Sequence, residues 1–147
     1  MKLSTKGRYA VRAMLDLAIH YGEGLVLLKN VARREEISER YLEHLLLNLK
    51  AAGLVNSVRG AKGGFSLARP PSEIKLGDIV RVCEGQLSVV ECVTDPEACA
   101  RSPRCATRDL WAELKYAIDG VLESLTLQDL VERQRKKEQV STAMYNI

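Results

Sequence analysis

The chain has 147 residues, of which 46% are hydrophobic, 28% charged and 5% aromatic. This size and composition suit one folded domain with a hydrophobic core, and they exclude a disordered or collagen-like chain. No apolar run approaches the roughly 18 residues needed to cross a bilayer, and the start of the chain lacks a signal-peptide core. We therefore expect a cytoplasmic protein without a membrane span.

The net charge of +3 is unevenly distributed along the chain. Residues 1–69 carry 12 Lys/Arg and 6 Asp/Glu, whereas residues 70–147 carry 10 and 13. The front half is therefore the candidate for contact with a polyanion. Solvated helix faces are the simpler explanation of the charges taken alone. The choice between such faces and a polyanion-binding surface therefore depends on sequence motifs.

Helical periodicity dominates the front half. Apolar residues recur at three- and four-residue steps over residues 5–21, and a short helix is predicted over 29–35. Ser38 caps a longer amphipathic helix over 39–52, which Gly53 ends. The last two helices have the length and spacing of a helix-turn-helix unit, although three amphipathic helices could also pack as a purely structural bundle.

A glycine-rich hairpin follows this unit. Residues 54–58 and 65–67 are predicted to be two strands, joined by a loop with three glycines that carries Arg59 and Lys62. The glycines let the backbone approach a surface closely while the two cations reach phosphates or a minor groove. Residues 1–70 are therefore predicted to form a winged helix-turn-helix that binds double-stranded DNA.

The second helix of the pair has polar residues near its exposed start that can read base edges in a major groove. A carboxylate that docks among phosphates is repelled and loses water, and this cost is recovered only if it accepts a hydrogen bond, for example from cytosine N4. Glu43 is therefore a candidate for rejecting DNA sequences that offer no such donor. A surface charge paired with Arg40 or Lys50 is the alternative for Glu43. The expected DNA contacts from helix and wing together are Arg40, Tyr41, Glu43, His44, Arg59 and Lys62.

The back half begins after Pro70 and Pro71. Residues 71–106 are predicted to hold a short helix, over 76–84, and then an irregular loop with three cysteines. Residues 107–135 are predicted to form two helices, and residues 136–147 a flexible tail. The first of these helices has an apolar stripe larger than so small a lobe needs, so we expect part of the stripe to lie in a dimer interface. Its residues are Leu110, Leu114, Ile118, Val121 and Leu125.

Cys92, Cys99 and Cys105 lie within fourteen residues of a loop that has little else to organise it. Three thiolates suit a soft metal centre, and the paired Cys-x2-Cys knuckles of structural zinc are absent. An iron–sulfur cluster is therefore favoured over zinc as the group that these thiolates bind. Free thiols or a regulatory disulfide are the alternative. The fourth cysteine, Cys83, recurs at helical spacing with core residues and is expected to be a buried hydrophobe.

Three segments together resemble a known family: Met1-Lys2-Leu3-Ser4-Thr5-Lys6-Gly7-Arg8-Tyr9-Ala10-Val11, Ile37-Ser38-x-x-Tyr41-Leu42-Glu43, and Gly53-Leu54-Val55-x-Ser57-Val58-Arg59-Gly60-x-x-Gly63-Gly64-Phe65. With the cysteine loop, they look like the IscR, NsrR and CymR family of bacterial transcription regulators, over residues 1–132. The resemblance implies a winged helix-turn-helix homodimer on a palindromic operator, with a long dimerisation helix over residues 107–125. It also implies a [2Fe–2S] cluster in the loop, with [4Fe–4S] as the variant of the family's nitric-oxide sensors.

The sequence departs from this family at the fourth cluster ligand. IscR-like members carry a histidine three residues after the last cysteine, and Arg108 stands there. The nitric-oxide sensors take an acidic residue from the partner's first helix, where this chain has Arg8. The fourth ligand is therefore open between a residue of the partner subunit and a carboxylate of the same chain, namely Glu84, Glu91, Glu97 or Asp109.

These features predict a transcription regulator whose operator binding is modulated by an iron–sulfur cluster, controlling genes of iron–sulfur biogenesis. A nitric-oxide- or iron-responsive repressor of the same family is the first alternative. A cluster-free regulator that acts through a partner protein is the second. No phosphate-binding glycine loop, nucleophile motif or acid–base pair points to an enzyme.

Overall fold

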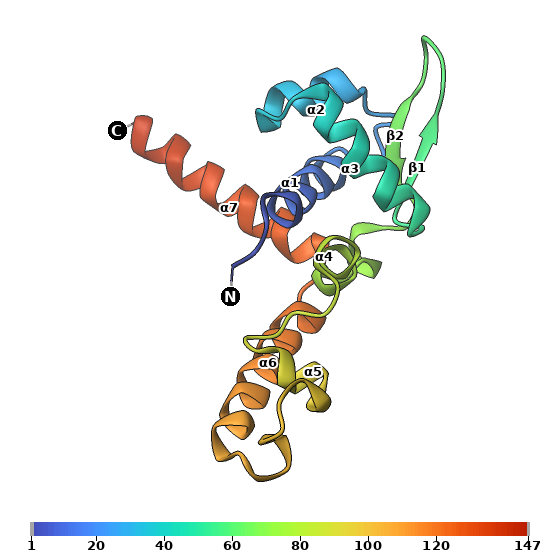
Figure 1. The fold of residues 1–147 in the computed structure, drawn as a ribbon. Helices are drawn as coiled ribbons and strands as arrows, with labels where there is room; N and C mark the ends of the chain where they lie inside the picture. The colour runs from blue at the N-terminus through green and yellow to red at the C-terminus, as the bar shows by residue number, and fades with distance from the viewer. Residues whose placement is uncertain (1, 147) are drawn as a thin grey trace.

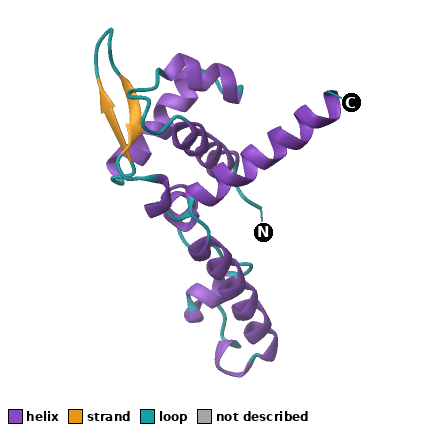
Figure 2. Cartoon of the chain, turned by 180° about the vertical axis from the view of Figure 1, so that it is seen from behind, coloured by secondary structure: helices purple, strands orange, loops and turns teal. Residues whose placement is uncertain are grey.

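The computed structural model describes residues 2–146. In chain order its elements are α1 (Thr5–Ile19), α2 (Leu28–Glu35), α3 (Glu39–Ala51), β1 (Val55–Val58), β2 (Gly64–Leu67), the 3-10 turn η1 (Pro71–Glu73), α4 (Leu76–Glu84), α5 (Glu91–Thr94), the 3-10 turns η2 (Pro96–Ala98) and η3 (Ser102–Arg104), α6 (Ala106–Ser124) and α7 (Leu127–Tyr145). Helices with one antiparallel hairpin confirm the predicted fold class (Figures 1 and 2).

The hydrophobic core is built around α1, which packs against α2, α3, α4, α7 and β2. The residues that give α1 its predicted apolar stripe, including Ala10, Met14 and Leu17, are buried there. Ser4 caps the helix by accepting a hydrogen bond from the backbone N–H of Gly7. Because so many elements meet on α1, the front lobe is one packed unit from which the hairpin projects (Figure 1).

The turn between α2 and α3 has the tight geometry of a helix-turn-helix. Glu36 adopts a left-handed conformation with φ of 55°, and Ile37 turns inward and is 6% exposed. Ser38 then caps α3, as predicted, by accepting a hydrogen bond from the N–H of Tyr41. The buried carboxylate of Asp16 in α1 accepts two hydrogen bonds from Arg34 of α2, at 2.8 and 2.7 Å, and so fixes the first helix of the pair to the core.

The wing is an antiparallel pair in which Val55 faces Leu67 and Val58 faces Gly64. A further bridge joins β2 to the segment before α2, since the N–H of Phe65 donates to the carbonyl of Val26 and the reverse bond is also made, both at 2.8 Å. A Cβ on Gly63 would lie 2.1 Å from the Val58 carbonyl oxygen, so only glycine fits there. The hairpin is thereby anchored to the segment that precedes α2.

Helices α5 and α6 form an arm that projects from the front lobe (Figures 1 and 2). Within the described part of the chain, α6 has no buried residue, although it is 19 residues long. It joins the lobe through α4 and through the turn into α7. No helix in residues 2–146 has the length and apolarity needed to cross a membrane.

Two predicted boundaries differ from the structure. The predicted cysteine loop contains the short helix α5 and two 3-10 turns, which its prolines and its mixed composition concealed. The last helix is predicted to end near residue 135, before a flexible tail, whereas α7 continues to Tyr145. Thr126 and Asp129 form a capping box at its start, and no Gly or Pro interrupts the helix formers that follow.

Candidate nucleic-acid interface and cysteine arm

The exposed face of α3 carries three of the residues predicted to contact DNA. Arg40, Glu43 and His44 are exposed, while the apolar stripe of the same helix is buried. Glu43 forms no ion pair with either Arg40 or Lys50 among the residues described, so the alternative of a paired surface charge is not found. The carboxylate is free to accept a hydrogen bond from another molecule.

Tyr41 has a different environment. Its ring is 37% exposed and lies edge-on to the ring of Tyr9 in α1, with centroids 5.9 Å apart. The guanidinium of Arg12 lies 5.2 Å from the centre of the Tyr9 ring and pairs with Glu35 of α2 at 3.5 Å. These contacts join α1, α2 and α3 beside the start of the exposed helix face. In the sequence, Tyr9 belongs to the apolar stripe and no local signal gives Arg12 a role.

The same cluster contains a carboxylate with a perturbed pKa. Partial burial raises the pKa of Glu35, and the negative charge of Asp16 raises it further, while Arg12 acts in the opposite direction. Arg12 and Arg34 are thus both paired with carboxylates of α1 and α2. Among residues 2–146, the wing cations Arg59 and Lys62 form no ion pair.

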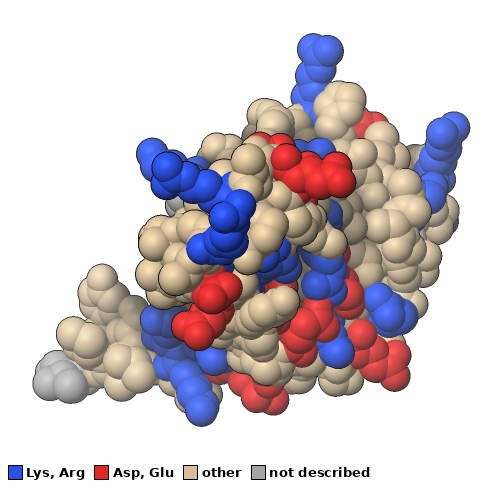
Figure 3. Space-filling model, turned by 60° about the horizontal axis from the view of Figure 1, so that its bottom comes forward, with Lys and Arg blue, Asp and Glu red and all other residues tan. Residues whose placement is uncertain are grey.

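Arg59 and Lys62 are exposed at the tip of the hairpin. The tip is closed by a hydrogen bond from the N–H of Gly63 to the carbonyl of Gly60, whose φ is 106°. The wing lies beside α3 and stands beyond the helices (Figure 1). Seen from the arm side, by contrast, acidic and basic side chains are interspersed and form no patch of one sign (Figure 3).

All four cysteines are free thiols. Cys92 is half-buried on α5, Cys99 is exposed after η2, and Cys105 is half-buried at the start of α6. Their chemistry fits a soft metal centre, since three thiols are carried by one segment of the arm. Their positions do not form a site as folded, because within residues 2–146 no three His, Cys, Asp or Glu side chains are grouped closely enough to hold a metal ion.

The thiols differ in their electrostatic environment. The Thr107 hydroxyl, 3.0 Å from the sulfur, and then the Arg108 backbone N–H lower the pKa of the Cys105 thiol. Burial raises the pKa of Cys83, which packs half-buried against the core as a hydrophobe, in keeping with its predicted role. Cys105 is thus the better prepared of the two to act as a thiolate.

Arg108, the residue in the place of the expected histidine, ties two parts of the arm together. Its Nε donates a hydrogen bond to the carbonyl oxygen of Cys92 at 3.0 Å, across from α6 to α5. Glu84, one of the possible fourth ligands, is engaged elsewhere, because it accepts hydrogen bonds from the backbone N–H and hydroxyl of Ser4. The other candidate carboxylates of the chain are exposed: Glu91, Glu97 and Asp109.

The predicted dimer stripe lies along α6. Leu110, Leu114 and Val121 are 49%, 41% and 57% exposed, whereas Ile118 and Leu125 are half-buried. Leu125 packs against the core at the base of the arm. Most of the stripe is therefore an uncovered apolar face.

Comparison with known proteins supports the interpretation of this architecture. A family model described as an iron-dependent transcriptional regulator, Rrf2, matches residues 3–133. The regulator CymR of Bacillus subtilis is 47% identical over 130 residues, covering 88% of this chain and 89% of the relative. IscR of Serratia proteamaculans is 42% identical over 134 residues, covering 91% and 81%.

Solved structures agree with this assignment. That of CymR, described as the global cysteine regulator of B. subtilis, superimposes with a TM-score of 0.78 at 44% identity, covering 90% of this chain and 98% of the other. That of T. potens IscR gives 0.74 at 47% identity, covering 91% and 88%. The family consists of transcription regulators and not of enzymes. This chain belongs to the Rrf2 family of DNA-binding transcription regulators.

Proposed function

We propose that this regulator binds a palindromic operator as a homodimer and that an iron–sulfur cluster on the arm modulates the binding. The genes it controls are those of iron–sulfur biogenesis, in keeping with its similarity to IscR relatives. A [2Fe–2S] cluster is favoured over [4Fe–4S]. The observation that carries the proposal is three free thiols, Cys92, Cys99 and Cys105, on the segment that joins the DNA-binding lobe to α6.

The DNA-binding part of the proposal assigns two kinds of contact. The exposed side chains of α3, Arg40, Glu43 and His44, enter a major groove, where they read base edges. Arg59 and Lys62 on the wing contact phosphates or a minor groove. Tyr41 keeps a position at the edge of this surface through its contact with Tyr9.

The dimer is formed through the uncovered face of α6. Leu110, Leu114 and Val121 would be removed from water by a second copy, and Ile118 and Leu125 continue the same stripe toward the lobe. Two copies joined in this way present two α3 helices, which is why a palindromic operator is expected.

Cys92, Cys99 and Cys105 would hold the cluster. When bound, it supplies a centre that oxidants and nitric oxide can damage. The chain's own contribution is the segment that carries these thiols, which the Arg108 bond now holds against α6. Because the thiols are not grouped within residues 2–146, this segment would have to rearrange to hold the cluster, and it lies between α4 and α6 in the chain.

Anaerobic purification with metal and sulfide analysis tests the cluster. We expect coloured protein with iron and sulfide in about equal amounts. Each single replacement of Cys92, Cys99 or Cys105 by alanine should give colourless protein. Cys83→Ala is the matched control and should keep the colour. A colourless wild type, or bleaching through Cys83→Ala alone, would exclude the proposed site.

A second candidate is a cluster-free regulator that responds through its cysteines or through a partner protein. The separation of the three thiols and the arginine at position 108 favour it. So does the similarity to B. subtilis CymR, which is described as a cysteine regulator. The same preparation distinguishes the two candidates, because this one predicts colourless protein that still binds its operator.

A further inference from the structure

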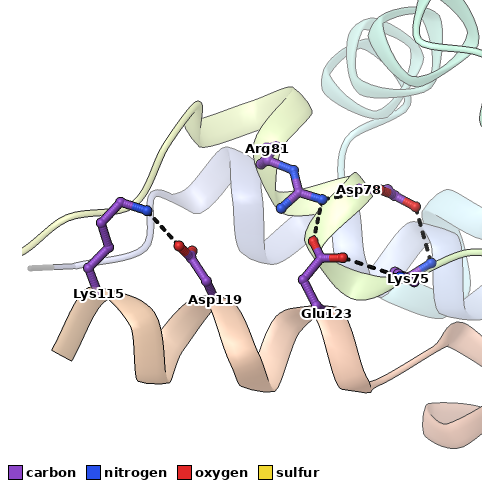
Figure 4. A network of polar contacts seen from close by, with 6 residues as sticks. All are labelled: Lys75, Asp78, Arg81, Lys115, Asp119 and Glu123. Carbon is purple, nitrogen blue, oxygen red and sulfur yellow. Dashed lines mark hydrogen bonds and ion pairs between the residues drawn. The ribbon is translucent and has the colours of Figure 1, made fainter. Parts of the chain in front are cut away.

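Four charged side chains join α4 to α6, and they are defined here as the α4–α6 clasp: Lys75, Asp78, Arg81 and Glu123 (Figure 4). The Glu123 carboxylate, near the end of α6, lies 2.5 Å from an Arg81 guanidinium nitrogen and 3.4 Å from the Lys75 Nζ. Asp78 accepts a hydrogen bond from the same guanidinium at 3.2 Å and so orients it. Two cations of the lobe thus hold one carboxylate of the arm.

The clasp lies close to a backbone joint between the same helices. The N–H of Leu76 donates a hydrogen bond to the carbonyl oxygen of Leu125, and the N–H of Leu127 donates one to the carbonyl oxygen of Ile74, both at 2.9 Å. These bonds fix the point at which the arm meets the lobe. Leu122 and Leu125 also pack against the core at this end of α6. The Arg81–Glu123 pair adds a charged contact five residues along α4 from Leu76 and two residues before Leu125.

The local sequence fits this arrangement. A Cβ on Gly77 would lie 2.8 Å from a Glu123 carboxylate oxygen and 3.1 Å from an Arg81 nitrogen, so the clasp rests directly on the backbone of α4. Arg81, and then Lys75, lower the pKa of Glu123, which is therefore ionised throughout the neutral range. Both partners are partly exposed, so the pair contributes little to overall stability.

We propose that Arg81 and Glu123 are positioning residues that set the angle of α6 on the DNA-binding lobe. Since α4 packs on α1 and α1 packs on α3, the lobe moves as one body about the joint. In a dimer joined through α6, that angle determines the distance between the two α3 helices, and thus the half-site spacing the dimer prefers. The inference rests on the proposed dimer and extends it to operator specificity.

Operators with the half-site spacing shortened or lengthened by one base pair test the proposal. Glu123→Gln keeps the shape of the side chain and removes its charge. We expect wild type to bind one spacing more tightly than the others. In this variant, the ratio of the affinities for the preferred and the altered spacing should fall about two- to fivefold. Asp119→Asn is the matched control, because Asp119 pairs with Lys115 inside α6 at 2.5 Å, and it should keep the wild-type preference.

Two further variants separate positioning from general damage. Gly77→Ala keeps every charge and displaces the clasp sterically, so it should relax the spacing preference as Glu123→Gln does. The double variant Arg81→Gln/Glu123→Gln should lose no more preference than Glu123→Gln alone, because both changes remove one interaction. Melting temperatures should stay close to that of wild type in all of them.

The outcomes are distinguishable. Wild type that sediments as a monomer and shows no spacing preference would contradict the proposed dimer, and the clasp proposal with it. Wild type that is dimeric and selective, with the selectivity intact in Glu123→Gln and Gly77→Ala, would overturn the clasp proposal alone.

Discussion

Tyr41, in the first turn of α3, lies edge-on to Tyr9 of α1, with the two ring planes at 89°. Arg12 covers the Tyr9 ring and pairs with Glu35 of α2. The start of the helix whose exposed face carries the predicted base contacts is therefore held by α1 and, through Arg12 and Glu35, by α2. The ring of Tyr41, rather than its hydroxyl, makes this contact.

Removing that ring should loosen α3. We expect Tyr41→Ala to lower the free energy of unfolding by about 1–2 kcal/mol, because it loses both the aromatic pair and apolar burial. Tyr41→Phe keeps the ring and should unfold like wild type in urea. An equal loss in both variants would assign the effect to the hydroxyl.

The wing cations should contribute to affinity without reading sequence. Arg59→Ala and Lys62→Ala are each expected to weaken binding to many DNA sequences alike and to reduce the slope of log K against log salt by about one unit. Titrations at several salt concentrations measure it. Lys137→Ala, on an exposed position in the middle of α7, is the control and should leave the slope unchanged. If Arg59→Ala and Lys62→Ala also leave the slope unchanged, the wing does not contact phosphates.

The apolar face of α6 should control assembly. A carboxylate placed there would have to be desolvated in the dimer, so Leu114→Asp or Ile118→Asp should give a monomer. Sedimentation and operator binding, measured on the same samples, should be lost together. A stable wild-type monomer that binds a palindromic site would contradict this expectation.

The thiols should differ in reactivity. Because the pKa of Cys105 is lowered and that of Cys83 is raised, Cys105 has the larger thiolate fraction at a given pH. Iodoacetamide should therefore modify Cys105 before Cys83 in native, cluster-free protein. Its rate should reach a plateau at lower pH than that of Cys83. Mass spectrometry of digested samples resolves the two sites. Unfolding in urea should make the modification rates of Cys105 and Cys83 similar.

The local patterns of this chain predicted its helices well and its long-range contacts poorly. Ser38, Gly53 and the apolar stripe of α3 are short-range signals, and each is found in the structure where it was expected. The wing was also predictable, because three glycines around two cations leave the backbone few alternatives.

Contacts between distant parts of the chain had no such signal. Glu84 bonds to Ser4 across eighty residues, which removes one candidate ligand that spacing alone had kept. The α4–α6 clasp also joins residues remote in sequence, and charged residues at those positions are equally typical of solvated helix faces. The extension of α7 was missed because its polar composition resembles that of a disordered tail.

The most direct test of the account is the operator affinity of one anaerobic preparation, measured before and after removal of its cluster with a chelator. The proposal predicts that affinity or sequence preference changes with the cluster. The same treatment of the colourless variant Cys92→Ala should change nothing, which separates loss of the cluster from effects of the chelator. Wild type that binds the same sites equally well with and without its cluster would contradict the central claim that the arm modulates DNA binding.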